Sequence, residues 1–107
     1  MGQIVIAAYR PRLGREKELL ELVRGHVPIL RDEGLATDRP AVAMRAQDGT
    51  IVEVFEWRSA SSADEAHTNP AVRALWESFG ALCEFVKLAD LPEARQQFPH
   101  FEPVELD

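Results

Sequence analysis

Two segments of the chain are typical of β-strands that are apolar on both faces, and this feature limits the fold more than any other. Residues 3–10 and 51–58 are rich in β-branched and aromatic side chains, as strands are. The two faces of the first segment consist of Ile4, Ile6 and Ala8 on one side and Val5, Ala7 and Tyr9 on the other. A sheet that is apolar on both sides has to be covered on both sides. We therefore expect these strands to lie inside a layered structure.

The segments between these strands alternate between helical and extended patterns. Over residues 15–33, apolar side chains recur at spacings of three and four, which predicts an amphipathic helix. Pro28 conflicts with a continuous helix, so we expect a kink near His26 or two shorter helices. Residues 41–46 form a further predicted strand, and the Asp-Gly pair that follows predicts a hairpin with residues 51–58.

The second half of the chain completes the order of elements. A helical region begins at Ser59 and restarts at Asn69-Pro70, with Asn as the N-cap and Pro in the first turn. Residues 84–91 are a predicted fourth strand, and residues 92–107 a C-terminal tail. The order is the β-α-β-β-α-β pattern of the ferredoxin-like α+β fold, in which helices cover one face of a four-stranded antiparallel sheet. We expect residues 1–107 to form a single domain, with a second copy covering the other face in a homodimer.

Charge and cysteine content exclude several classes of partner. The chain has 12 basic and 18 acidic side chains, a net charge of −6, which disfavours nucleic acid and anionic membranes. It has no apolar run of the roughly 20 residues that a spanning helix needs, and its start lacks a signal-peptide pattern. The single cysteine, Cys83, fits a reducing compartment, so we expect a cytoplasmic protein. The histidines have no ligand spacing, and no metal is expected.

The candidate site residues lie on the strands. Glu53, Phe55 and Trp57 share one face of the third strand. A charged Glu53 on that apolar face needs Arg10, Arg45 or water as a partner. It is interpreted either as part of a salt bridge at the edge of a barrel or as a pocket carboxylate that takes a proton from a phenolic substrate. Trp57 is either a core or interface anchor or a cavity wall.

Two further side chains have open interpretations. Tyr9, followed by Arg10, either donates a hydrogen bond to a ligand oxygen or lies in a dimer interface. His67 precedes the helix restart, where it either bonds to carbonyl groups left free by the interruption or acts as a general base or ligand donor.

Several short motifs together resemble one family. They are Ile4 to Arg10, Gly14-Arg15-Glu16, Phe55-Glu56-Trp57-Arg58-Ser59, Ala66-His67 and Asn69-Pro70. Over about residues 3–91 the chain resembles the antibiotic biosynthesis monooxygenase-like family. The resemblance implies a dimeric α+β barrel of two ferredoxin-like subunits, each with a cavity between its sheet and its helices.

The resemblance also implies a chemistry. Some members of that family oxygenate electron-rich polycyclic phenols without metal or flavin, because the deprotonated substrate itself reduces dioxygen. By this resemblance Trp57 and Tyr9 would orient the substrate, and His67 or Arg10 would stabilise the developing charge. Other members degrade haem, but Tyr9 and Trp76 stand here where those carry Asn and His, so haem degradation is not expected.

We therefore expect a homodimer that binds a small aromatic or quinone-like molecule and acts as a cofactor-independent monooxygenase. The expected catalytic residues are His67, Trp57 and Tyr9, and the expected substrate-binding residues are Arg10, Glu53 and Phe55. The alternative is a dimer of the same fold that binds a ligand or responds to stress without catalysis.

Overall fold

The structure, a computed structural model that describes residues 1–107, combines one antiparallel sheet with three α-helices. The strands are β1 (Gln3–Pro11), β2 (Val42–Arg45), β3 (Ile51–Trp57), β4 (Cys83–Val86) and β5 (Glu102–Val104). The helices are α1 (Glu16–Asp32), α2 (Ser62–Thr68) and α3 (Pro70–Leu82). Two short 3-10 turns, η1 (Leu88–Asp90) and η2 (Pro92–Arg95), follow β4. None of the helices has the length and apolar character that crossing a membrane requires.

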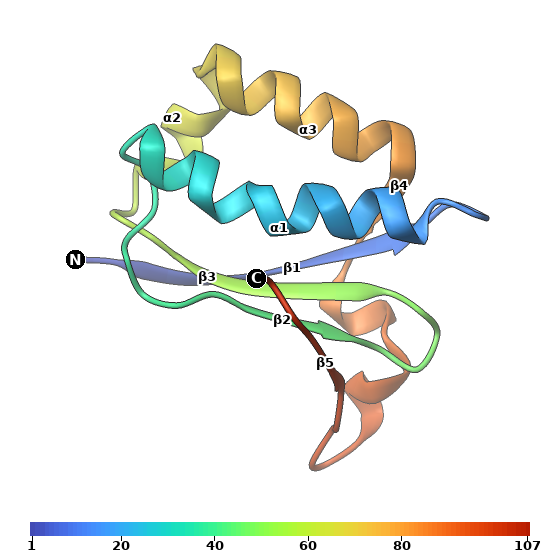
Figure 1. The fold of residues 1–107 in the computed structure, drawn as a ribbon. Coiled ribbons are helices and arrows are strands. Elements are labelled where there is room, and N and C mark those ends of the chain that lie inside the picture. The colour runs from blue at the N-terminus through green and yellow to red at the C-terminus, as the bar shows by residue number, and fades with distance from the viewer.

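The sheet has the order β4-β1-β3-β2-β5, and every pair of neighbours is antiparallel. The first four strands fit the β-α-β-β-α-β pattern that the sequence predicts. The expected number of four strands was wrong, because residues 102–104 of the C-terminal tail pair with β2 as a fifth strand. All three helices lie on one side of the sheet, and the segment that follows β4 lies on the other (Figure 1).

Helix α1 runs without interruption through Pro28, so the expectation of two shorter helices was wrong. A proline inside a helix costs about 3 kcal/mol or more. That cost is outweighed because the inner face of α1 is buried against the sheet, and each fully buried Val or Leu contributes about 1.5–3 kcal/mol. The buried apolar residues of this face are Leu19, Val23, Val27 and Leu30. The chain leaves the helix at Gly34, which has a positive φ of 74°.

The second helical region restarts as the sequence predicts. The Asn69 side chain accepts a hydrogen bond from the Val72 N–H at 3.1 Å, and Pro70 occupies the first turn of α3. The predicted fourth strand at residues 84–91 was too long, since β4 ends at Val86 and the chain then turns into η1. This early end sends the tail across the uncovered face of the sheet.

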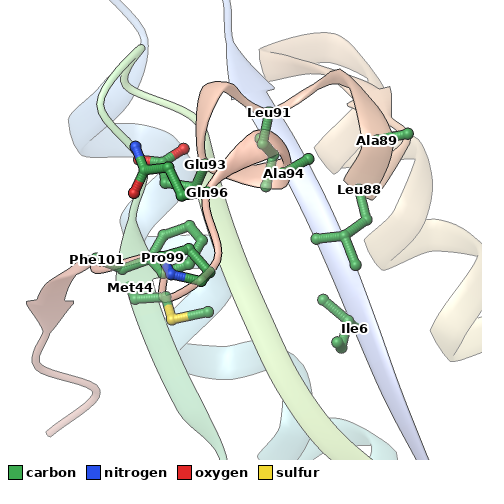
Figure 2. Close-up of a pocket in the computed structure, with 10 residues that line it drawn as sticks. All are labelled: Ile6, Met44, Leu88, Ala89, Leu91, Glu93, Ala94, Gln96, Pro99 and Phe101. Atoms are coloured by element: carbon green, nitrogen blue, oxygen red, sulfur yellow. The ribbon is translucent and has the colours of Figure 1, made fainter.

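The two faces of the sheet are covered differently. The helices pack on the face that carries Tyr9, Phe55 and Trp57, all of which are buried. On the opposite face, the tail packs over Ala8 and Val52 through Leu91 and Phe101. The tail leaves a groove of about 640 Å³ between itself and the sheet. In Figure 2, Ile6 and Leu88 lie on one side of this groove and Met44 and Phe101 on the other.

Candidate functional site

An aromatic cavity lies between the helices and the sheet. Its volume is about 300 Å³, and seven of its eight lining residues are hydrophobic. Tyr9, Phe55 and Trp57 line it from the sheet, together with Val5 and Ala7, while Phe85 comes from β4. His26 of α1 and Trp76 of α3 line it from the helices. Both tryptophans and the one tyrosine of the chain therefore meet at this cavity.

A chain of hydrogen bonds runs along one wall of the cavity. Glu53 Oε1 accepts from the Tyr9 hydroxyl at 2.8 Å and lies 2.7 Å from His26 Nδ1. The Trp76 indole N–H donates to His26 Nε2 at 3.0 Å. Tyr9, His26 and Glu53 are 3%, 3% and 0% exposed, so the two contacts of Glu53 are shielded from water. Four residues from β1, β3, α1 and α3 thus form one buried polar network in apolar surroundings.

The donors and acceptors of this network determine where the imidazole proton lies. An indole N–H can only donate, so His26 Nε2 accepts from Trp76. The proton of a neutral imidazole is then on Nδ1, which donates to Glu53. Because the Glu53 carboxylate accepts from Nδ1–H, the other ring nitrogen, Nε2, keeps its lone pair and can act as a base at the cavity wall.

Tyr9 is held in its neutral form by the same carboxylate. Burial raises the pKa of Tyr9 well above its usual value, and the charge of Glu53 and the hydrogen bond to it act in the same direction. The phenol ring is also held by Phe79, whose ring centroid lies 4.9 Å away. Tyr9 therefore acts as a fixed hydrogen-bond donor to Glu53. Its hydroxyl makes this bond when no ligand occupies the cavity.

Glu53 is partnered differently from the sequence expectation. Neither Arg10 nor Arg45 reaches it, because Arg10 pairs with Asp48 at 3.2 Å and Arg45 pairs with Glu16 and Glu102. Its partners are instead two neutral donors, Tyr9 and His26. The reason is the pleat of β1, which turns Tyr9 towards the helices and the next residue, Arg10, to the opposite face.

The predicted site residues fall into two groups. Tyr9, Phe55 and Trp57 line the cavity, and Glu53 lies in its hydrogen-bonded wall. Arg10 and His67 do not line it. His67 is exposed at the outer side of Trp76, with ring centroids 5.1 Å apart, and its Nδ1 lies 2.7 Å from the Ala63 carbonyl oxygen.

Two residues of the network, His26 and Trp76, were not among the predicted site residues. Both belong to helical apolar stripes, where a core role is the ordinary interpretation. A signal for His26 was available, since it lies three residues after Val23 and four before Leu30, both buried on the inner face of α1. A histidine in a buried stripe needs a polar partner, and Glu53 on an apolar strand face needs one as well.

The chain has no match among protein-family models, curated proteins or solved structures. No group of three or more His, Cys, Asp or Glu side chains is placed to hold a metal ion.

The groove under the tail is larger than the aromatic cavity, but the one acidic side chain in its lining, Glu93, has a structural contact. Buried Glu93 accepts from the Gln47 N–H at 2.7 Å and so holds the tail to the hairpin. The aromatic cavity, with a base at its wall, is therefore the candidate active site.

Proposed function

We propose that the aromatic cavity binds a small phenol and that His26 removes its hydroxyl proton. The observation that carries this proposal is the buried His26–Glu53 pair, at 2.7 Å, beside a cavity whose other walls are apolar and aromatic. Aromatic walls suit a flat ring, and the one basic nitrogen suits an acidic hydroxyl group. Glu53 stabilises the imidazolium that forms when His26 takes the proton.

The size of the cavity limits the ligand to one or two rings. A cavity of about 150 Å³ accepts benzene, and ligand sites begin at about 300 Å³. The aromatic cavity has about 300 Å³, which places it at the lower end of that range. Phe85 is 59% exposed at the cavity and leaves its rim open to an entering molecule. A small phenol is therefore a better fit than a large polycyclic one.

Binding requires one rearrangement. In the free protein the Trp76 N–H occupies His26 Nε2, so the ligand hydroxyl has to replace it there. Trp76 is only partly buried, and on its outer side it contacts the exposed ring of His67. A movement of the indole towards this side would free the nitrogen. His67 is then a support for Trp76 and has no contact with the ligand.

The reaction we propose is oxygenation of the bound phenol by dioxygen, without a cofactor. The substrate must be a phenol whose phenolate is electron-rich enough to reduce dioxygen once its proton has been removed. A phenol with a free para position would react with one O₂ to give a para-quinone and one water, so the ring gains one oxygen atom and loses two hydrogens. The protein's part is to bind the ring, form the anion and exclude water.

The test uses 4-nitrophenol, whose phenolate absorbs visible light. We expect the wild-type protein to bind it and to convert it to the phenolate at a pH where free 4-nitrophenol is neutral. His26→Gln should bind it with little ionisation, whereas the control His100→Gln, at an exposed histidine outside the aromatic cavity, should behave like the wild type. Equal ionisation in His26→Gln would refute the proposal. Oxygen uptake with 1-naphthol then separates an oxygenase from a protein that only binds phenols.

We also propose that the molecule is a dimer of ferredoxin-like subunits, forming an α+β barrel. The support is an apolar row on the outer face, where Ile6 pairs with Val54 and Val54 pairs with Val42 across three strands. Ile6 and Val42 are 49% and 54% exposed, and the tail leaves both open. A second copy of the same face would bury this row.

A further inference from the structure

A second cavity lies under α1, towards the β2 edge of the sheet. Its volume is about 320 Å³. Arg24 and Arg31 of α1 line it, together with Ala41 just before β2 and Leu106 near the C-terminus. The aromatic cavity lies towards β1 and β4, so the two cavities flank the same stretch of α1.

Glu53 is the residue that connects the two cavities. It borders the second cavity but is not part of the lining of the aromatic one. Its Oε1 atom is held by Tyr9 and His26, at the wall of the aromatic cavity. Its Oε2 atom is buried and has no hydrogen-bond partner within the protein. Glu53 thus stands between the base and the second cavity, with one oxygen still free.

We propose that the second cavity holds water and is the route by which the proton taken by His26 leaves the protein through Glu53. This inference rests on the proposed function, because it concerns the proton that the bound phenol gives up. It assigns to Glu53 a proton-carrying role in addition to its orientation of His26. It also assigns a function to a cavity that the ligand does not enter.

The chemistry of the second cavity favours water. A buried carboxylate oxygen without a partner costs about 1–3 kcal/mol, and a bound water removes that cost. A water molecule needs polar partners and a volume of at least about 10–15 Å³. Glu53, Arg24 and Arg31 line this cavity, whose volume of about 320 Å³ far exceeds the minimum. Glu53 Oε2 is fully buried in the free protein, so its contact with this water requires a small opening around the carboxylate.

The aromatic cavity is a poor exit for the same proton. Apart from His26, its lining residues are apolar or aromatic, the Tyr9 hydroxyl already donates to Glu53, and an indole N–H accepts no proton, so no acceptor there continues the path. A bound phenol would also fill the space next to His26 Nε2. The transfer we propose runs from the ligand O–H to His26 Nε2, from His26 Nδ1–H to Glu53, and from Glu53 to water. Each step moves one proton. Glu53 returns to its starting form, and His26 ends as its other neutral tautomer, with the proton on Nε2, where it can donate to the phenolate oxygen.

The test follows proton release when 4-nitrophenol binds, by stopped-flow with a pH indicator in weak buffer. In the wild type we expect close to one proton released per phenolate formed, in step with the phenolate absorbance. Glu53→Gln keeps an oxygen that can accept from Tyr9 and His26 but cannot carry a proton. Its release rate should fall by about 100-fold, the ordinary contribution of a positioned proton carrier.

A second variant examines the cavity without changing the network. Ala41→Leu places a larger apolar side chain in the second cavity, and its release rate should fall by about tenfold, part of the same contribution. The size-matched control is Ala89→Leu in the groove under the tail, which should release at the wild-type rate. Wild-type release rates in both Glu53→Gln and Ala41→Leu would overturn the route. Absence of phenolate in the wild type would instead refute the proposed function.

Discussion

The two faces of the sheet look alike in the sequence and differ in the structure. Strands β1 and β3 carry apolar side chains on both sides, yet only the helix-covered face contains a buried polar network. The outer face has an exposed apolar row, and the C-terminal tail crosses one part of this face. The difference shows that apolar patterning predicts which faces of the sheet must be covered. A single polar residue on such a face indicates the position of a candidate functional site.

Hydrogen bonds among its own members offset most of the cost of burying the network, and within it only Glu53 Oε2 lacks a partner. Glu53 Oε1 accepts from two donors, and His26 uses both of its ring nitrogens. Removal of one member leaves the others buried and unpaired, which costs more than the lost bond itself contributes. The exposed apolar row on the outer face has no such dependence, so substitutions of Ile6 or Val42 should act on association and not on folding.

The largest effect is expected from Glu53→Leu, which removes the acceptor of both Tyr9 and His26. Two buried donors then lack a partner, and the free energy of unfolding should fall by about 3 kcal/mol. Urea unfolding followed by tryptophan fluorescence measures it. Glu53→Gln keeps an accepting oxygen and should lose less than half as much. A Leu variant as stable as the wild type would show that the network does not stabilise the fold.

On the outer face, Ile6→Lys should weaken self-association by about 100-fold, or about 2.7 kcal/mol, because an ammonium group would be buried in an apolar contact. Sedimentation equilibrium over a range of concentrations measures the dissociation constant. The control is Leu13→Lys, since Leu13 is fully exposed in the turn before α1 and away from this face. A wild-type protein that stays monomeric at high concentration would contradict the proposed dimer.

A smaller effect concerns the only tyrosine of the chain. Burial and Glu53 raise the pKa of Tyr9 above its usual value, so Tyr9 stays neutral in the folded protein at a pH where the unfolded chain ionises it. The free energy of unfolding should therefore be unaffected by Tyr9 below about pH 10 and should fall as the pH rises above that value.

Absorbance of the ionised phenol follows this titration directly, because no other tyrosine contributes. In Glu53→Gln the midpoint should move down towards the ordinary value, since the negative charge is gone. Tyr9→Phe should lose less stability at alkaline pH than the wild type and keep only the loss that comes from other buried groups, chiefly Cys83, whose pKa is raised to about 11. A native midpoint at the ordinary tyrosine value would mean that Tyr9 is not buried beside a carboxylate.

The smallest effect is a difference in thiol reactivity between the two faces. Cys83 is 1% exposed on the helix-covered side, and burial raises its pKa to about 11. We expect little reaction with an aromatic disulfide reagent until the protein is unfolded in urea. Introduction of Ile4→Cys on the outer face should add one fast-reacting thiol in a monomeric background such as Ile6→Lys. Rapid reaction of native Cys83 would argue against the tight packing of the helices on this face.

Much of the fold follows from the sequence. The strand faces, the Asp48-Gly49 hairpin and the helix restart at Asn69-Pro70 are local signals, and the structure confirms them. The fifth strand was missed because three residues, one of them Pro103, carry no clear strand pattern and gain their pairing only from β2. Helix α1 continues through Pro28 because burial of one face outweighs a local penalty, which no local rule can weigh.

The candidate site was predicted in part for a similar reason. Tyr9, Glu53, Phe55 and Trp57 share the helix-covered face, which the alternation along β1 and β3 already places together. The contribution of His26 depends on how α1 crosses the sheet, and that is a tertiary property. The sequence signal for their contact is that His26 and Glu53 are each a single polar residue within an apolar pattern, one on a helix and the other on a strand.

The proposed chemistry depends on Glu53, which holds His26 as a neutral base with Nε2 at the aromatic cavity. Long-range ¹H–¹⁵N correlation of the imidazole resonances shows which ring nitrogen carries the proton, with His26 assigned by comparison with His26→Gln. We predict a protonated Nδ1 and an unprotonated Nε2 in the free protein. A proton on Nε2 with a bare Nδ1, or a doubly protonated ring at neutral pH, would contradict the account.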